Sequence, residues 1–291
     1  MKIKKTLSEK VVLLIITILL TFIALITLYP FWNTLVMSIS SASSAMASSI
    51  KWVPTEISFD SWKIVLNSKY VWQGMWNTVY KTVLGTGISV FAVVALAYPL
   101  SKKDFIGRNF FTKLLIFTMM FNGGMIPSFL LVKNLNLMDT VFALVLPGAV
   151  SAFNVIILRN FFESIPKSLE EAAKIDGAND IYILGKIILP LSLPALATVT
   201  LWIVVGHWNA WFDSVLYISD RSRMVIQVVL REMILTDKID SSMNVSEVNI
   251  VPPSDVMKAT ITMFVTLPVL LVYPFIQKYF TKGIMIGSIK E

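Results

Sequence analysis

Few residues in this sequence could do chemistry, and most are polar side chains isolated in apolar stretches. The single histidine, His207, and the absence of cysteine exclude thiol nucleophiles, disulfides, cysteine zinc sites and two-histidine zinc motifs, so no metal site is predicted. A neutral imidazole and amides suit hydroxyl-rich ligands, but such groups also form hydrogen bonds between packed helices. Both interpretations stay open for a candidate substrate path of Asn122, Asn154, His207, Trp208, Asn209 and Trp211.

Motifs that would make the chain an enzyme are missing from the sequence. Neither G-x-S-x-G nor H-E-x-x-H occurs, which argues against an intramembrane hydrolase. A phosphate-binding loop needs G-x-x-x-x-G-K-[ST], and Gly177 with Gly185-Lys186 has the wrong spacing and no following hydroxyl residue. We therefore predict no catalytic residue and no ATP hydrolysis by this chain alone.

The polar segment 159–190 has the most informative local pattern. Ser168 and Glu171 have the spacing of a capping box, in which each side chain bonds to the other residue's backbone amide, so a short helix should begin there. Glu170 and Lys174 are four residues apart, which predicts an ion pair on the same helix.

The same pattern predicts how this helix ends and where the next one begins. Asp176-Gly177 should terminate it, because glycine tolerates the left-handed conformation of a helix end. Asn179 and Asp180 can cap a second helix that runs to Pro190 and into an apolar stretch. One helix face should carry small and apolar residues open to a partner, namely Leu169, Ala172 and Ala173.

The elements that position these residues are apolar segments suited to lipid. The chain is 56% apolar and 15% charged, with a mean hydropathy of +0.73. A helix needs roughly 20 residues to cross a bilayer core. Six stretches of about that length lack charged residues, which predicts an all-α integral membrane protein with six transmembrane helices. They are 11–28, 82–101, 114–132, 140–158, 187–212 and 259–277.

The basic residues predict the orientation in the membrane. Lys and Arg are roughly twice as dense in 1–10, 102–113, 159–186 and 278–291 as in 38–81, 133–139 and 213–258. Both termini and segment 159–186 are therefore expected to be cytoplasmic, and 38–81 and 213–258 external. The net charge of +7 has this cause, so no nucleic-acid partner is predicted.

Segment 159–190 also carries a recognisable motif. Its spacing is Glu171-Ala172-Ala173, three residues, Gly177, nine residues, Ile187, one residue and Leu189-Pro190. This resembles the EAA motif of permease subunits of ATP-binding-cassette importers. The form EAAKIDGA resembles the carbohydrate, or maltose-type, branch, and 126–236 resembles permeases of Gram-positive polysaccharide and pectic-oligosaccharide importers.

The resemblance implies a type I ABC importer permease fold and a role in oligosaccharide import across a bacterial cell membrane. Residues 168–174 would form a coupling helix in a groove of the ATPase. The implied partners are a second, homologous permease in a heterodimer, two ATPase subunits that bind ATP and Mg²⁺, and an extracellular or lipid-anchored solute-binding protein. The implied coupling residues are Ser168, Leu169, Glu170, Glu171, Ala172, Ala173, Lys174, Asp176 and Gly177.

Two further functions remain as alternatives. A self-sufficient secondary carrier would transport without ATP, but the six stretches lack the acidic and basic residues that relay ions in such carriers. An ABC permease for a non-sugar solute would share the motif. The sequence does not identify the particular sugar.

Overall fold

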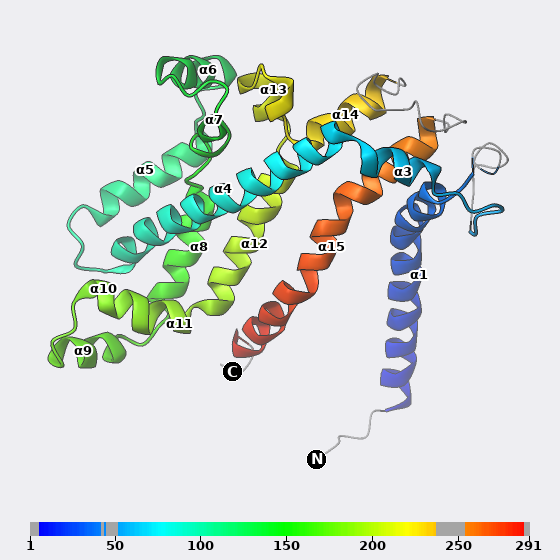
Figure 1. Ribbon diagram of the computed structural model, residues 1–291. Coiled ribbons are helices and arrows are strands. Elements are labelled where there is room, and N and C mark those ends of the chain that lie inside the picture. The colour runs from blue at the N-terminus through cyan, green and yellow to red at the C-terminus, as the bar shows by residue number, and fades with distance from the viewer. Residues whose placement is uncertain (1–5, 42–43, 45–51, 237–253, 288–291) are drawn as a thin grey trace. The chain divides into compact units, whose positions relative to one another are not determined.

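A computed structural model of the chain describes residues 6–41, 44, 52–236 and 254–287 (Figure 1). The predicted segments 1–10, 38–81, 213–258 and 278–291 lie partly outside these residues. All regular elements of the described part are helices, as predicted. The chain forms two compact units, Met1–Val71 with Leu230–Leu267 and Trp72–Val229 with Pro268–Glu291, and each is considered by itself.

The first unit contains α1 (Leu7–Ser38), α3 (Asp60–Asn67) and the beginning of α15 (Ser254–Gly287). Thr6 and Glu9 form a capping box at the start of α1, which satisfies backbone amides that a helix start leaves free. From Leu7 to Leu28 the apolar side chains of α1 are exposed on every face, as expected for a helix solvated by lipid. Thr260 of α15 donates a hydrogen bond of 3.2 Å to the carbonyl of Ser38.

The second unit is built on α4 (Lys69–Ser101), α8 (Ala152–Glu163) and α12 (Leu193–Asn209). These helices meet at a buried apolar cluster, the inner core, and residues of segment 159–186 also enter it. The inner core consists of Val93, Ala97, Tyr98, Leu100, Val155, Leu158, Phe162, Ile165, Ile183, Ile188, Val199 and Ile203.

Three predicted spans are confirmed as continuous helices that are long and apolar enough to cross a membrane. They are α1, α4 and the part Asp255–Val272 of α15, which cover or overlap the predicted stretches 11–28, 82–101 and 259–277. α4 begins well before the predicted stretch, because Lys81, in its fourth turn, ends the charge-free window.

The predicted third span, 114–132, is not one helix. α5 (Arg108–Met120) and α6 (Met125–Asn134) meet at an angle of 115° around residues 121–124. Gly124 has a φ of +89°, a conformation that L side chains rarely adopt, so the Gly123-Gly124 pair allows the chain to turn here.

The predicted fourth and fifth spans are also interrupted. Stretch 140–158 divides into α7 (Val141–Val145) and α8, with Pro147-Gly148 in the gap. Stretch 187–212 is bent by 85° at Ser192. Before this bend lie α10 (Asp180–Ile183), the π-helix η1 (Leu184–Ile188) and α11 (Leu189–Leu191), and α12 follows it.

Prolines explain the bend at Ser192. Pro190 and Pro194 flank it, and each lacks the backbone amide that would continue the preceding helix. In the described residues the spans therefore number three, or up to five if each bent pair counts as one. The predicted number of six is not confirmed.

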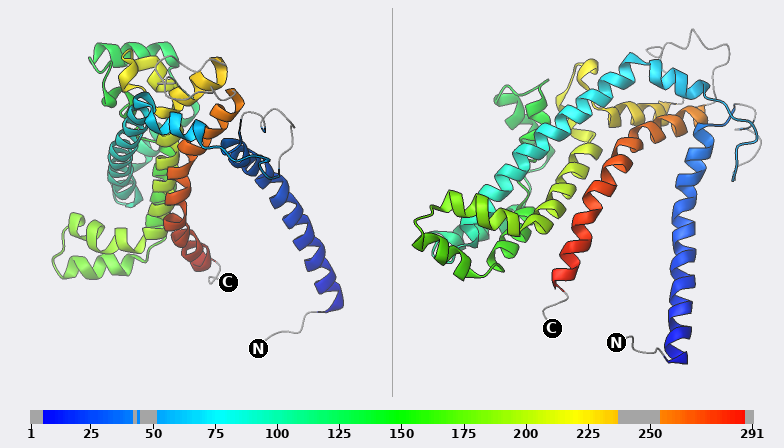
Figure 2. Two further views of the ribbon diagram at one scale, coloured as in Figure 1. Left: turned by 45° about the vertical axis from the view of Figure 1, so that its right-hand side comes forward. Right: turned by 60° about the horizontal axis from the view of Figure 1, so that its bottom comes forward.

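Two groups of short helices lie at opposite ends of the second unit, with α4, α8 and α12 running between them (Figures 1 and 2). One end holds α9 (Lys167–Ile175), α10 and α11. The other holds α6, α7, α13 (Phe212–Tyr217) and the 3-10 turn η2 (Arg221–Arg223), which leads into α14 (Ile226–Thr236).

Candidate functional site

The helix predicted from the EAA segment is present as α9, but its start differs from the prediction. Pro166 occupies the N-cap position, and no side chain caps the helix. Ser168 lies inside the first turn, whereas a capping hydroxyl must belong to the residue before the helix. The predicted Ser168–Glu171 capping box is therefore wrong.

The end of α9 confirms the predicted turn. Gly177 has a φ of +81°, the left-handed conformation that favours glycine. The amide of Ala178 donates to the carbonyl of Ala173 at 2.9 Å, and that of Gly177 to Lys174 at 3.1 Å, which is a Schellman motif. Asn179 then caps α10 as predicted, because its Oδ1 accepts from the amide of Tyr182 at 2.8 Å.

The predicted common face of Leu169, Ala172 and Ala173 is divided in the structure. Ala173 packs against the inner core, whereas Ala172 is exposed. The outward face of α9 instead presents Glu171, Ala172 and Ile175, and 86% of Ile175 is exposed. Within the described residues, no other element covers this face of α9.

The charged residues of α9 pair differently from the prediction. Glu170 forms an ion pair with Lys102, just after α4, and not with Lys174. Lys174 lies 3.7 Å from Asp180 at the start of α10. Glu170 turns inward with Ala173, so a cation from the neighbouring element reaches it more readily than one on its own helix.

A second ionic group lies beside this one, at the end of α8. Glu163 accepts from Arg159 at 3.1 Å and also pairs with Arg108 at the start of α5. Partial burial raises the pKa of Glu163, but the hydrogen bonds and charges of Arg159 and Arg108 outweigh burial and hold that pKa below its usual value. This group connects α5 to α8.

The candidates for the substrate path lie on different elements. Asn122 is in the break between α5 and α6, where its Oδ1 accepts from the amide of Gly124 at 2.9 Å. Asn154 is buried in the first turn of α8. The other four lie at the end of α12 and just beyond it, where Trp208 is 7% exposed and Trp211 packs edge-on against Phe212. The structure thus groups His207, Trp208, Asn209 and Trp211, and places Asn122 and Asn154 elsewhere.

A buried basic residue next to this group was missed by the sequence analysis. Lys81 of α4 is 1% exposed, and its ammonium donates to the carbonyl of Ala210 at the end of α12 at 2.8 Å. Further along α4, Ser89 Oγ lies 3.4 Å from His207 Nε2. Gly85 makes room for the imidazole, since a Cβ there would lie 2.7 Å from the ring.

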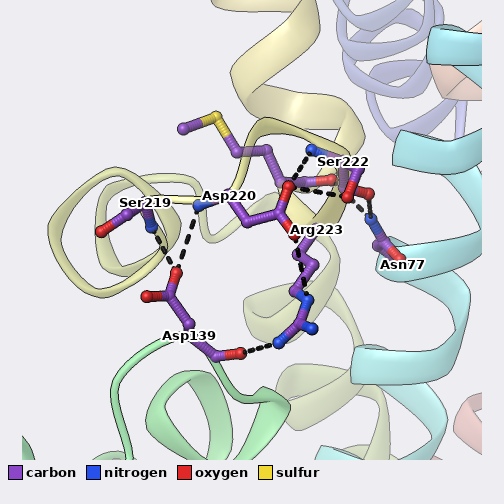
Figure 3. A network of polar contacts seen from close by, with 7 residues as sticks. Asn77, Asp139, Ser219, Asp220, Ser222 and Arg223 are labelled. Carbon is purple, nitrogen blue, oxygen red and sulfur yellow. Dashed lines mark hydrogen bonds and ion pairs between the residues drawn. The ribbon is translucent and has the colours of Figure 1, made fainter.

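A polar network joins the short helices at the other end of the second unit (Figure 3). Its centre is Asp139, whose φ is +57°. Its Oδ1 accepts from the amides of Ser219 at 2.6 Å and Asp220 at 3.2 Å, and its carbonyl accepts from Arg223 at 2.6 Å. One residue thus fixes the turn after α13 against the start of α7.

The network also reaches α4. The side-chain amide of Asn77 donates to the carbonyls of Ser222 at 2.8 Å and Met224 at 3.0 Å. Hydrogen bonds from Ser222 hold the pKa of Asp220 below its usual value. A cavity of about 250 Å³ lies beside the network, with Asn77, Asp139 and Arg223 in its wall.

Comparison with known proteins places this architecture in one family. Residues 90–286 match the family described as "binding-protein-dependent transport system inner membrane component". The chain is 43% identical over 279 residues to the polygalacturonan/rhamnogalacturonan transport system permease protein YtcP of Bacillus subtilis, which covers 96% of this chain and 97% of that one. It is 40% identical over 265 residues to protein LplC of the same organism, covering 91% and 90%.

A solved structure agrees with this assignment. A chain of a bacterial ABC transporter involved in the import of the acidic polysaccharide alginate superposes with a TM-score of 0.88 at 36% identity, over 96% of this chain and 100% of that one. The chain therefore belongs to the family of binding-protein-dependent transport permeases, which are membrane components of transport systems. The resemblance to permeases of carbohydrate ABC importers is confirmed.

Proposed function

We propose that this chain is one of two permeases in an ABC importer of acidic oligosaccharides, and that it forms half of the translocation path. The observation that carries the substrate class is the 43% identity, over nearly the whole chain, to a permease named for polygalacturonan and rhamnogalacturonan. The alginate importer supports the same class, because its cargo is also an acidic polysaccharide.

The ATPases would dock on the outward face of α9. Glu171, Ala172 and Ile175 present a carboxylate, a small residue and a large apolar residue on one exposed surface. The Gly177 turn fixes the angle between this surface and α10. Two separate ATPase subunits would bind ATP and Mg²⁺ and hydrolyse the nucleotide, and this chain would bind neither.

The chain would cross a bacterial cell membrane six times with both termini in the cytoplasm. α1, α4 and α15 would make three crossings, and the bent pairs α5–α6 and α10–α12 would make two more, since each is long and apolar enough. The sixth would be α7 together with α8, which carries α9 at its cytoplasmic end. The remaining partners would be a homologous second permease and a solute-binding protein on the external face, where the Asp139 network would lie.

The decisive experiment is purification of the chain from native membranes in mild detergent, followed by identification of the bound proteins. Recovery of a P-loop ATPase and a second permease, with uptake of oligogalacturonides in ATP-loaded liposomes, is expected. Uptake of a neutral sugar or a non-sugar solute would overturn the substrate class. Transport by the chain alone without ATP would replace the importer with a secondary carrier.

A further inference from the structure

A charged contact holds the coupling helix α9 to the end of α4. Lys102, the first residue after α4, pairs with Glu170 of α9, and the two side chains are only 20% and 16% exposed. Ion pairs so shielded are screened much less by salt than pairs at the surface.

The aromatic ring of Tyr98, in α4, fixes the position of the Lys102 ammonium. Its Nζ lies 4.3 Å from the ring centroid of Tyr98, which is 8% exposed and belongs to the inner core. A cation over an aromatic face is attracted by the ring's negative π surface. Tyr98 in turn packs edge-on against Phe162 of α8, with 6.5 Å between the two ring centroids, so the ammonium is anchored to two helices of the second unit.

The space around Lys102 is not close-packed. One cavity of about 260 Å³ is walled partly by Glu163, Lys167 and Glu171, and another of about 360 Å³ by Phe105, Asp180 and Leu184. Lys102 borders both cavities. Ala173 is the residue of α9 that packs against the inner core, and its side chain is a single methyl group. The apolar contact between α9 and α4 is therefore small, and the ion pair carries much of their connection.

Hydrogen bonds also hold the other half of α4. α4 has 33 residues, which at about 1.5 Å per residue is about 50 Å. Asn77 bonds to the turn of the Asp139 network, and Lys81 bonds to the carbonyl of Ala210 at the end of α12. A displacement of α4 at its Lys102 end therefore reaches both the polar network and the end of α12.

We propose that Lys102 and Glu170 are positioning residues that join the coupling helix to α4, so that movement of α9 moves α4. The inference rests on the proposed function, in which an ATPase docks on α9. Tyr98 sets where the ammonium lies, and the flanking cavities let α9 tilt about the pair. Neither residue needs to touch the ATPase or the sugar.

The test measures sugar imported per ATP hydrolysed by the complete complex in proteoliposomes. Lys102→Met and Glu170→Gln each remove one charge and should lower this ratio at least about fivefold, the lower limit typical of coupling between distant sites. The reversed pair, Lys102→Glu with Glu170→Lys, restores opposite charges but places a carboxylate over the Tyr98 ring, so its ratio should rise above that of both single variants without reaching that of the natural complex. Lys103→Gln, a change of the exposed neighbour, is the matched control and should leave the ratio unchanged.

The outcomes separate this inference from the proposed function. Retention of ATPase by the unmodified chain tests the proposed function first, and its absence would overturn both. If the unmodified complex couples normally and the single variants import as much sugar per ATP as it does, the Lys102–Glu170 connection is refuted and the proposed function stands. A reversed pair no better than the single variants, with ATPases still bound, would also refute the proposed connection. That connection requires opposite charges at positions 102 and 170, and the reversed pair supplies them.

Discussion

The turn at Gly177 should control coupling through its backbone conformation and not through its size. Its φ is +81°, and apart from Gly177 itself and its two chain neighbours no described residue has an atom within 4 Å of where a Cβ would be, so a side chain would meet open space. An L-residue forced into the left-handed conformation costs about 1–2 kcal/mol, with alanine at the lower end, β-branched valine at the upper end and asparagine below both. About 2 kcal/mol shifts a local equilibrium by about 30-fold.

This cost falls on the Schellman motif that ends α9. If the turn rearranges to relieve it, the hydrogen bonds from Ala178 to Ala173 and from Gly177 to Lys174 are lost, and α9 changes its angle to α10. We therefore expect uptake per ATP to be highest in the natural protein and to decrease from Gly177→Asn through Gly177→Ala to Gly177→Val. The complex with Gly177→Val should hydrolyse ATP with little import. Insertion into the membrane should not change.

The assay is uptake and ATP hydrolysis measured on the same proteoliposomes, with the amount of bound ATPase determined separately. Gly185→Ala is the matched control, because Gly185 lies in η1 without a positive φ and a Cβ there also meets open space. Normal uptake by Gly177→Val, or an asparagine variant worse than the alanine variant, would refute the conformational argument.

Three other measurements test the orientation, the Asp139 network and the Glu163 ion group. With no native cysteine to remove, Lys63→Cys should react with an impermeant thiol reagent from outside intact cells, and Lys103→Cys only after the membrane is opened; the reverse pattern would invert the proposed orientation. Asp139→Ala should lower thermal stability in detergent, because two backbone amides lose their acceptor at about 1–3 kcal/mol, whereas Asp139→Asn, which retains an acceptor oxygen, should stay close to the natural protein. Glu163, whose pKa is depressed, stabilises the fold above its unfolded pKa and loses this contribution as pH falls through its folded pKa. The melting temperature should therefore fall less on acidification in Glu163→Gln, and an equal fall in both proteins would contradict the role of this ion group.

Features of the EAA segment that depend on adjacent residues could be predicted from the sequence. Gly177 ends α9 and Asn179 caps α10 because each acts on backbone groups within a few residues. The start of α9 was mispredicted because Pro166, with its fixed φ, ends the preceding turn and the helix begins at the next residue. Lys102 could not be identified as the partner of Glu170, because the two are 68 residues apart and only the packing of α4 brings them together.

The breaks in the apolar stretches show what hydropathy alone leaves out. A charge-free window measures transfer into lipid, and it gives 114–132 the same status as 82–101. Backbone continuity is a separate property, and it fails where Gly123-Gly124 permits a turn of 115° and where Pro190 and Pro194 remove amides. Such irregular backbone is tolerated at membrane depth only where protein or water satisfies it.

Lys81 is a buried basic residue that the same window hides. It directly precedes the charge-free stretch 82–101, so the window assigned it to an external loop, although α4 carries it deep into the second unit. Small or polar residues recur around it at helical spacing, namely Thr78, Lys81, Thr82, Gly85 and Ser89. That spacing marks a polar helix face, and the structure places it against His207 and the end of α12. A buried ammonium that bonds to a carbonyl at the C-terminal end of a helix is stabilised by the negative end of the helix dipole. The end of α12, where four substrate-path candidates gather, is therefore positioned by α4, the same helix that is joined to α9 through Lys102.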